Sequence, residues 1–463
     1  MRRNETRRKF LIGGVTAGAL ALAGCATGGD DTDDEATDDD HDRDDDAADD
    51  DSTDVDDEVP AYEVWALDQG TDTIYLYEPD EDGYGGDEPF AHAETIDLND
   101  LLDDEGPIVP HMIDYSSDYE YAAIACTAGA RTLVFRTDDR ELVAELDTGA
   151  GSHFAGFSPD DEYLHVDAIG EEAIVRVEAD LADEDFEIVE EIDLREDETV
   201  LDAGIESGAP ICHQYARDGR SLHTLGPAYG DGALVVVDHE EFAVDRAYSN
   251  DELPTNCGTV PHPTEEKFYL TAGAPSDPDE DGSGVGDYYV YDTAEDEVLV
   301  DGESTEGVDA HGFWFTPDGE ELWVLNRETN DGVVLDPETD EVVEEIDAFG
   351  PADDDDPEES DAPDIMWATP DGEYVVVTLR GPAPLSGDPH AATGVTPGFS
   401  VLDVETKEIV GVVEPDPIDD YDEEDIEAAR EEDDDAPAIP DFHGIGVRPI
   451  DDFDTAIDTS PPY

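Results

Sequence analysis

One short segment recurs seven times along this chain, and this repetition limits the fold more than any other feature. Each copy is a mostly apolar stretch that ends near a turn of the Pro-Asp-Gly type. The copies are HMIDYSSDY from His111, HFAGFSPDD from His153, ICHQYARDG from Ile211, GTVPHPTEE from Gly258, HGFWFTPDG from His311, DIMWATPDG from Asp364 and HGIGVRP from His443. Their spacing averages about 55 residues, which is longer than that of WD repeats.

Three further strand types accompany each copy. The second strand is dominated by aliphatic and aromatic residues, as in YLHVDA from Tyr163 and YVVVTLR from Tyr374, which suits a buried strand. The third ends in motifs such as YDT or LDPET, and the fourth reads EIVEEID or EVVEEID. The pattern therefore predicts an all-β fold, a seven-bladed β-propeller with four antiparallel strands per blade.

The two ends of the repeat region are out of phase. YEVWALD, TIYLYEP and AETIDL precede the first copy, whereas HGIGVRP has no successor strands. We expect these segments to complete one shared blade and so to close the ring, which leaves only short protected sheet edges. The propeller is predicted over residues 61–452, with insertions at 381–398 and 416–440 and a tail at 453–463; the second insertion is expected to be a solvated acidic loop.

The SPDG-type turn, followed by an aromatic-aliphatic strand and a VLD-type strand, resembles the YVTN family of β-propellers, in its haloarchaeal lipoprotein form. More distantly, it is similar to the propellers of cytochrome d1 and of the methylamine dehydrogenase heavy chain. The resemblance covers residues 62–450 and implies the fold. It implies little about function, because this scaffold carries binding proteins, enzymes and surface-layer components.

The N-terminus has the order of an export signal, MRRNETRRKFLIGGVTAGALALAGC. Its apolar run ends at Cys25 and is shorter than the roughly 20 residues that a membrane-spanning helix needs. TRRKFL resembles a twin-arginine signal and LAGC a lipobox, which implies lipidation of Cys25. We expect a signal over 1–25, a disordered acidic tether over 26–60, and a protein anchored on the outer face of the cytoplasmic membrane.

The charge of the chain is extreme. It has 131 acidic and 20 basic residues, a formal net charge of −111, spread along the whole sequence. This balance excludes nucleic acid as a partner. Repulsion between the acids is mostly screened at molar salt, where the Debye length is about 3 Å. The composition therefore predicts a halophilic protein.

Alignment of the copies by their turns places five metal-ligating residues at one repeat position: His111, His153, His311, His443 and Asp364. Ile211 and Gly258 occupy this position in the other two copies, and His213 lies two residues further along its strand. The position begins the innermost strand, so these side chains should meet at one mouth of the central channel. Imidazole and carboxylate groups there predict a zinc or copper site. Alternatively, the rings only bond backbone groups of the next blade.

Three of the scarce basic residues, Arg131, Arg327 and Arg380, follow second strands and are expected at the same mouth. Their guanidinium groups could bind a carboxylate, phosphate or other oxyanion ligand. The alternative is that they pair with neighbouring carboxylates.

Three cysteines remain besides Cys25. Cys212 and Cys257 sit at similar places in neighbouring copies, which allows a disulfide or a soft metal ligand. Cys126, inside YAAIAC, is interpreted as a core residue. The acidic turns at 277–284 and 352–356 do not match the calcium loop and are interpreted as solvated loops.

We find no G-x-S-x-G motif, phosphate-binding glycine loop or C-x-x-C-H haem attachment. A binding lipoprotein needs the least machinery and is the first hypothesis, with a small ligand or metal in the channel and a transporter or cell-surface protein as partner. Two alternatives stay open: a redox enzyme subunit with a channel cofactor, and a structural or adhesive surface module.

Overall fold

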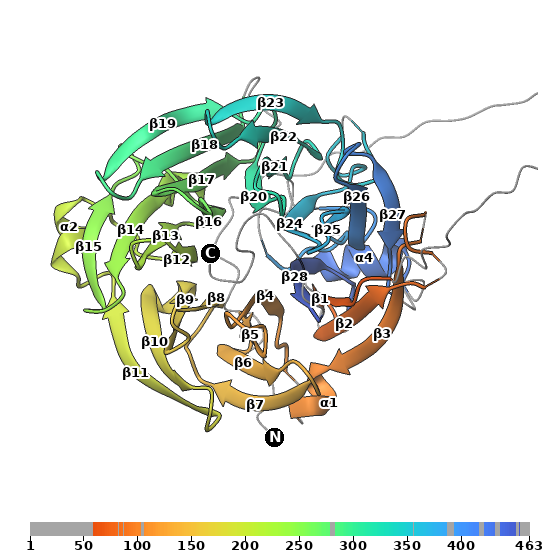
Figure 1. The fold of residues 1–463 in the computed structure, drawn as a ribbon, viewed down its shortest axis with the longest axis horizontal. Helices are drawn as coiled ribbons and strands as arrows, with labels where there is room; N and C mark the ends of the chain where they lie inside the picture. Colours follow the sequence, from red (N-terminus) through yellow and green to blue (C-terminus); the bar gives the residue numbers. More distant parts are fainter. Residues whose placement is uncertain are drawn as a thin grey trace, which may run out of the picture. The chain divides into compact units, whose positions relative to one another are not determined.

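Seven four-stranded antiparallel sheets form the described part of the chain, arranged as the blades of a β-propeller (Figure 1). This computed structural model describes residues 59–81, 83–86, 88–102, 106–277, 283–354, 356–386, 393–415, 421–430, 436–450 and 453. The predicted signal, its Cys25 and the tether up to residue 58 lie outside these ranges. The seven repeats therefore correspond to the seven blades, as the sequence predicts.

The blades are numbered here along the chain, and the strands of each are given from the innermost outward. Blade 1 is β28 (Phe442–Pro449), β1 (Tyr62–Asp68), β2 (Thr73–Pro79) and β3 (Phe90–Asp97). Blade 2 is β4 (Pro110–Tyr115), β5 (Tyr121–Cys126), β6 (Arg131–Arg136) and β7 (Glu141–Leu146). Blade 3 is β8 (Ser152–Phe157), β9 (Tyr163–Ala168), β10 (Ala173–Asp180) and β11 (Asp185–Asp193). Blade 4 is β12 (Pro210–Tyr215), β13 (Arg220–Leu225), β14 (Ala233–Asp238) and β15 (Ala243–Tyr248).

Blade 5 is β16 (Thr259–Pro261), β17 (Lys267–Ala274), β18 (Val285–Asp292) and β19 (Glu297–Ser304). Blade 6 is β20 (Ala310–Phe315), β21 (Leu322–Asn326), β22 (Asp331–Asp336) and β23 (Glu341–Ile346). Blade 7 is β24 (Pro363–Ala368), β25 (Tyr374–Leu379), β26 (Gly398–Asp403) and β27 (Ile409–Val413).

The ring closes in blade 1, where the last strand of the chain pairs with the first. Strand β28 lies antiparallel to β1, with Val447 opposite Val64. Strands β2 and β3 continue the same sheet outward. The predicted joint between the N-terminal strands and HGIGVRP is therefore confirmed.

The helices are short: α1 (Leu98–Leu102), α2 (Glu198–Asp202), α4 (Glu423–Arg430), and the 3-10 turns η1 (Ile169–Glu171) and η2 (Tyr229–Asp231). Helix α4 lies in the second insertion, where the sequence suggested only a loop. The Asp422 side chain accepts hydrogen bonds from the backbone N–H groups of Glu424 and Asp425 at 2.9 and 3.2 Å, which caps the helix. Among the described residues, no helix has the length and apolar character needed to cross a bilayer.

The recurring Pro-Asp-Gly turn joins the first and second strands of a blade. In blade 6, the Thr316 hydroxyl donates to the Asp318 carboxylate (2.7 Å) and accepts from the backbone N–H of Glu321 (3.2 Å). Gly319 has a φ of 71°, a conformation that favours glycine. Blade 3 repeats the pattern with Ser158. The conserved spacing of the motif thus reflects a specific turn.

The first strands of neighbouring blades contact one another around the ring, so they line its centre. Near the repeat position that the sequence singles out, the pairing register shifts in six blades. A bulge of this kind re-aims one side chain out of the regular alternation. The candidate ligands therefore lie where the backbone leaves the regular ladder.

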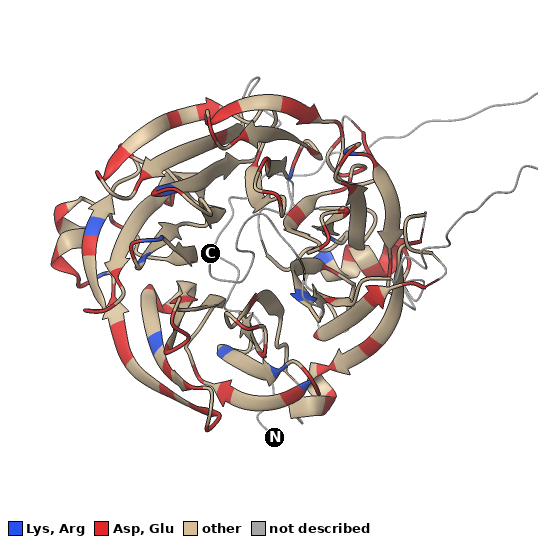
Figure 2. Ribbon diagram, viewed as in Figure 1, with Lys and Arg blue, Asp and Glu red and all other residues tan. Residues whose placement is uncertain are grey.

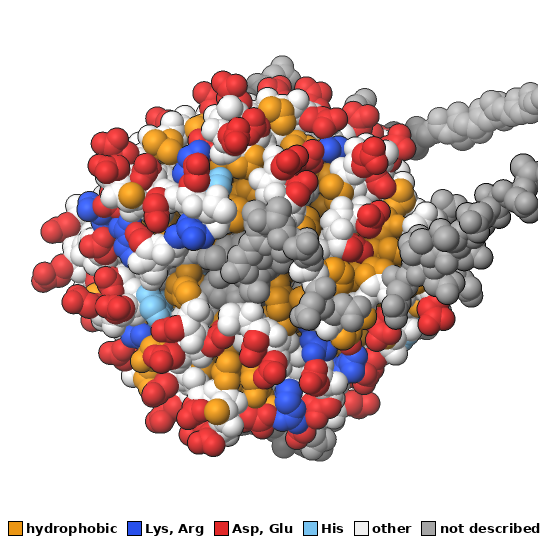
Figure 3. All heavy atoms as spheres, in the orientation of Figure 1, with side chains coloured by type: hydrophobic (Ala, Val, Ile, Leu, Met, Phe, Trp, Pro, Cys, Tyr) orange, Lys and Arg blue, Asp and Glu red, His pale blue; other side chains and the backbone are white. Residues whose placement is uncertain are grey.

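Acidic side chains concentrate on the outer strands. Figure 2 shows them in bands along the rim, and the exposed face in Figure 3 is covered by carboxylates with few basic groups. In β11 the side chains are mostly exposed, whereas those of β9 are nearly all buried. Blade 3 is thus apolar in its second strand and anionic in its outer strand.

Candidate metal-binding channel

A cavity at the centre of the ring is lined by the first strands of all seven blades. Its volume is about 60 Å³, enough for a metal ion with a few waters. The side chains on its wall include imidazoles and thiols. They include His153, His213, His311, His443, Cys212 and Cys257.

Three imidazoles meet at one end of this channel. His111 and His153 face each other with 2.8 Å between their Nε2 atoms. The rings of His111 and His443 stack with centroids 3.6 Å apart. Three blades therefore bring their first-strand histidines into contact, as the repeat alignment predicts.

The second nitrogen of two of these rings is held by a carbonyl oxygen. His111 Nδ1 lies 2.8 Å from the side-chain Oε1 of Gln69, and His443 Nδ1 lies 3.1 Å from the backbone oxygen of His111. Each carbonyl oxygen accepts a hydrogen bond from Nδ1–H, so the lone pair of each neutral ring is on Nε2. Histidines that bind metals are commonly oriented in this way.

Glycines after two of the histidines let neighbouring first strands approach closely. A Cβ on Gly444 would lie 2.5 Å from the backbone oxygen of His111, and one on Gly312 would lie 2.7 Å from that of Asp364. These contacts are too short for any side chain. The His-Gly pairs therefore have a packing role in addition to the role of the imidazole.

A charged wall lies beside the three imidazoles. His311 Nε2 is 2.8 Å from Asp364 Oδ1, and Arg380 donates to Asp364 Oδ2 at 2.8 Å. Arg380 also forms a two-pronged pair with Asp441 at 2.8 and 2.9 Å. Arg327 pairs with Asp309 at 2.8 Å, and His443 Nε2 is 3.5 Å from Asp364.

Burial and charge separate the histidines into two protonation classes. Burial, together with His443 and His153, holds the pKa of His111 well below its usual value. Burial also lowers the pKa of His153 to about 4 and that of His443 well below its usual value. Burial and Arg327 oppose protonation of His311, but Asp364 outweighs them and raises its pKa to about 9. Three rings are therefore neutral ligands at pH 7, whereas His311 is a cation.

The two cysteines at the channel are free thiols in this structure. Cys212 Sγ lies 3.8 Å from His153 Nδ1, and burial raises the pKa of the Cys212 thiol well above its usual value. Cys257 is buried and lines the same cavity. The pairing of the two remains a prediction. Cys126 is fully buried in the apolar core, as interpreted from its strand.

Comparison with known proteins identifies no family for this chain. No protein-family model matches the sequence, and no curated protein matches it either. One similar solved structure is hydrazine synthase of Kuenenia stuttgartiensis, with 13% identity and a TM-score of 0.46 over 73% of this chain and 86% of that one. Another is a mitotic checkpoint complex, with 11% identity and a TM-score of 0.44 over 66% of this chain and 78% of that one. These values support no statement about activity or ligand.

The three arginines do not converge. Arg327 and Arg380 both approach Asp364, with their Nη1 atoms 3.6 and 2.8 Å from its carboxylate. Arg131 instead pairs with Glu145 of the outer strand β7 at 2.6 Å. Each guanidinium group thus pairs with a carboxylate, which is the alternative to oxyanion binding that the sequence left open. Binding of an oxyanion remains a prediction.

A second polar cluster lies between blades 3 and 4. The sequence analysis named His213 as a candidate ligand but did not find its partners Asp167 and His223. His213 and His223 sit opposite each other on β12 and β13, and both donate to the carboxylate of Asp167 on β9. All three side chains are fully buried. The available signal was an aspartate and histidines inside second strands, YLHVDA and RSLHTL, whose position in the repeat predicts burial.

Proposed function

We propose that this protein is a binding protein that holds one transition-metal ion, zinc or copper, at the mouth of its channel. The proposed ligands are the Nε2 atoms of His111, His153 and His443. The meeting of these three neutral imidazoles is the observation that carries the proposal. Imidazole suits both metals, and a site that binds rather than reacts can use every coordination position for protein ligands.

The donor atoms of His111 and His153 have close to the spacing that such an ion requires, whereas His443 has to move closer to them, because its donor atom gathers within 4.8 Å with those of His311 and Asp364 instead. A Zn–N bond length of about 2.0–2.1 Å puts two ligands of a tetrahedral site about 3.3 Å apart. The Nε2 atoms of His111 and His153 are 2.8 Å apart, so they need to separate by about half an ångström. The Cys212 thiol, next to His153, is placed to supply a sulfur ligand after loss of its proton.

The charged wall does not repel a cation strongly, because its charges balance. Three cations, His311, Arg327 and Arg380, face three carboxylates, those of Asp309, Asp364 and Asp441. Because these charged groups pair with one another, the adjacent imidazoles are the groups that can donate electron pairs to a metal ion.

In this proposal the protein works outside the cell, tethered to membrane lipid through Cys25 after twin-arginine export. A transporter or another cell-surface protein is then the partner that receives or delivers the metal.

The test is zinc affinity measured by competition with a chromophoric chelator on the full chain at molar salt. Replacing His443 by Ala removes one ligand and loosens the stack on His111. We expect the affinity of the channel site to fall at least about 100-fold.

The matched control is His92→Ala, because His92 lies on the outer strand β3 and is exposed. It should leave affinity unchanged. Equal affinities in the parent, His443→Ala and His92→Ala proteins, all shown to be folded by circular dichroism, would exclude the channel site.

A further inference from the structure

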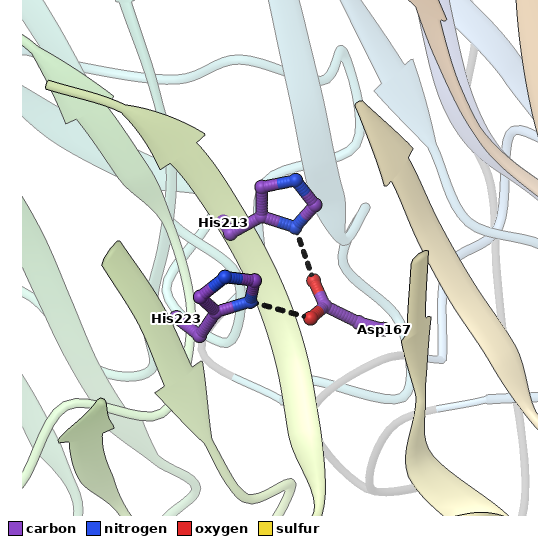
Figure 4. A group of neighbouring side chains, drawn as sticks. All are labelled: Asp167, His213 and His223. Atoms are coloured by element: carbon purple, nitrogen blue, oxygen red, sulfur yellow. Dashed lines mark hydrogen bonds and ion pairs between the residues drawn. The ribbon is translucent and has the colours of Figure 1, made fainter. Parts of the chain in front are cut away.

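The cluster between blades 3 and 4 has the donor set of a metal centre and lies outside the channel mouth. Asp167 Oδ2 is 2.6 Å from His213 Nδ1, and Asp167 Oδ1 is 2.7 Å from His223 Nδ1. The two rings stack with centroids 4.4 Å apart. Figure 4 shows both imidazoles facing the carboxylate, one at each oxygen. All the ligand atoms lie within 4.8 Å of one another.

We propose that Asp167, His213 and His223 form a second, fully buried site for a zinc-type divalent cation. The ligands are the two Nδ1 atoms and the carboxylate. Because each carboxylate oxygen already faces one imidazole, Asp167 can bind through both oxygens and complete four-fold coordination. The bound ion would cross-link the second strand of blade 3 to the first two strands of blade 4.

Charge favours a cation in this cluster. The Asp167 carboxylate is fully buried, and each of its oxygens faces one imidazole nitrogen, of His213 or of His223. Among the described residues, the ion pairs of Asp167 are with these two histidines only. Asp364, in contrast, already meets Arg380 and Arg327.

When Nδ1 of an imidazole binds a metal, the proton on Nδ1 has to move to Nε2 of the same ring. A neutral imidazole bound through Nδ1 carries its proton on Nε2. His223 Nε2 lies 2.9 Å from the Ser221 hydroxyl, which can turn toward His165 Nδ1 at 3.2 Å. His213 Nε2 has no hydrogen-bond partner among the described residues. Metal binding therefore needs no ionised side chain beyond Asp167.

One ligand of the buried site borders the channel. His213 lines the channel cavity, next to Cys212 and on the same wall as His153. An ion that reaches the channel mouth thus has a histidine of the buried site within the same cavity. Since the other two ligands are fully buried, exchange should be slower here than at the mouth.

The test is zinc content, by mass spectrometry, of the full chain loaded at molar salt and freed of excess metal. We expect two zinc ions per chain in the parent protein. The triple variant, in which His111, His153 and His443 are replaced by Ala, should retain one zinc ion. Asp167→Asn should also retain one; this change keeps the shape and hydrogen-bonding capacity of the side chain but removes its charge. His223→Gln is a second variant of the buried site, and His262→Gln, in blade 5, is the matched control that should retain both ions.

Cobalt substitution identifies the site that remains. In the triple variant, the bound cobalt should show a visible spectrum of nitrogen and oxygen ligands with no thiolate charge-transfer band. In excess chelator, the melting temperature of the Asp167→Asn protein should equal that of the parent. A loss of metal in this variant is then not caused by a loss of fold.

Each outcome decides one of the two sites. The buried site would be overturned if Asp167→Asn and His223→Gln both retained two zinc ions. It would also be overturned if the parent held one ion and the triple variant none. Either result leaves the channel proposal standing. One ion in the parent that survives in the triple variant but is lost in Asp167→Asn would support the buried site and overturn the channel proposal.

Discussion

Burial sets the protonation of individual side chains throughout the channel. Four histidines share one repeat position but differ in charge. His311 lies 2.8 Å from the Asp364 carboxylate, whereas His111 and His443 stack on each other. The other three are desolvated and stay neutral. One residue type at one repeat position therefore supplies both ligands and a cation.

Asp114 gives a prediction for pH dependence. Burial raises its pKa to about 7 from 3.8. Between about pH 4 and 7 the native state then holds a proton that the unfolded chain has lost, so the free energy of unfolding falls as pH rises, by at most about 4 kcal/mol. Asp114→Asn cannot ionise and keeps an acceptor for the Phe157 N–H. It should therefore stabilise the protein at pH 8 and change little at pH 4.

Urea unfolding of both proteins at molar salt and the two pH values measures this effect. The difference between variant and parent should grow with pH. A difference of the same size at pH 4 and pH 8 would mean that Asp114 is ionised in the native state throughout.

At the level of strands, the sequence predicted the order of the elements but not their exact offsets. The turn motif and apolar second strands depend on local residues, so blades and ring closure could be read directly. The channel ring was less predictable, because the alignment put Ile211 and Gly258 at the ligand position. Cys212 lines the cavity in place of Ile211, and Cys257 lines it beside Gly258. Register shifts in the first strands, such as that between Pro210 and His213, displace side chains in a way that turn spacing does not encode.

Contacts between elements distant in sequence were also beyond sequence reasoning. Gln69, from the end of β1, orients His111, and Asp441 joins the segment before β28 to Arg380. Asp167 meets His213 and His223 only because blade 3 packs on blade 4. Each of these pairs requires the ring to be assembled before the partners meet.

Asp441 yields a prediction about the closure of the ring. Its carboxylate accepts from Arg380, from Gln69 Nε2 (2.7 Å) and from the backbone N–H groups of Gly381 (3.1 Å) and Leu385 (2.8 Å). Replacing it by Ala leaves the fully buried Arg380 short of its main partner. The free energy of unfolding should fall by about 3–5 kcal/mol.

The comparison for this variant is Arg131→Ala, which breaks the solvent-exposed pair with Glu145 and should cost less than about 1 kcal/mol. Denaturant unfolding at molar salt measures both. Similar losses in the two variants would show that the Asp441 cluster does not stabilise the ring closure.

At the scale of the whole molecule, net charge dominates. With a formal charge of −111 and carboxylates along the outer strands, the folded state is strained by repulsion in dilute salt. The Debye length falls from about 10 Å at 0.1 M to about 3 Å at 1 M salt, which screens neighbouring acids. We expect the melting temperature, followed by circular dichroism, to rise steeply from 0.1 to 3 M KCl. A melting temperature that is flat over this range would contradict the predicted adaptation to salt.

The central claim, a metal ion held by three imidazoles at the channel mouth, is tested most directly by anomalous diffraction at the zinc absorption edge. Crystals of the zinc-loaded protein, grown at molar salt, would be measured above and below the edge. The account predicts an anomalous peak within bonding distance of the Nε2 atoms of His111, His153 and His443. Zinc-loaded crystals without a peak among these three rings would contradict it.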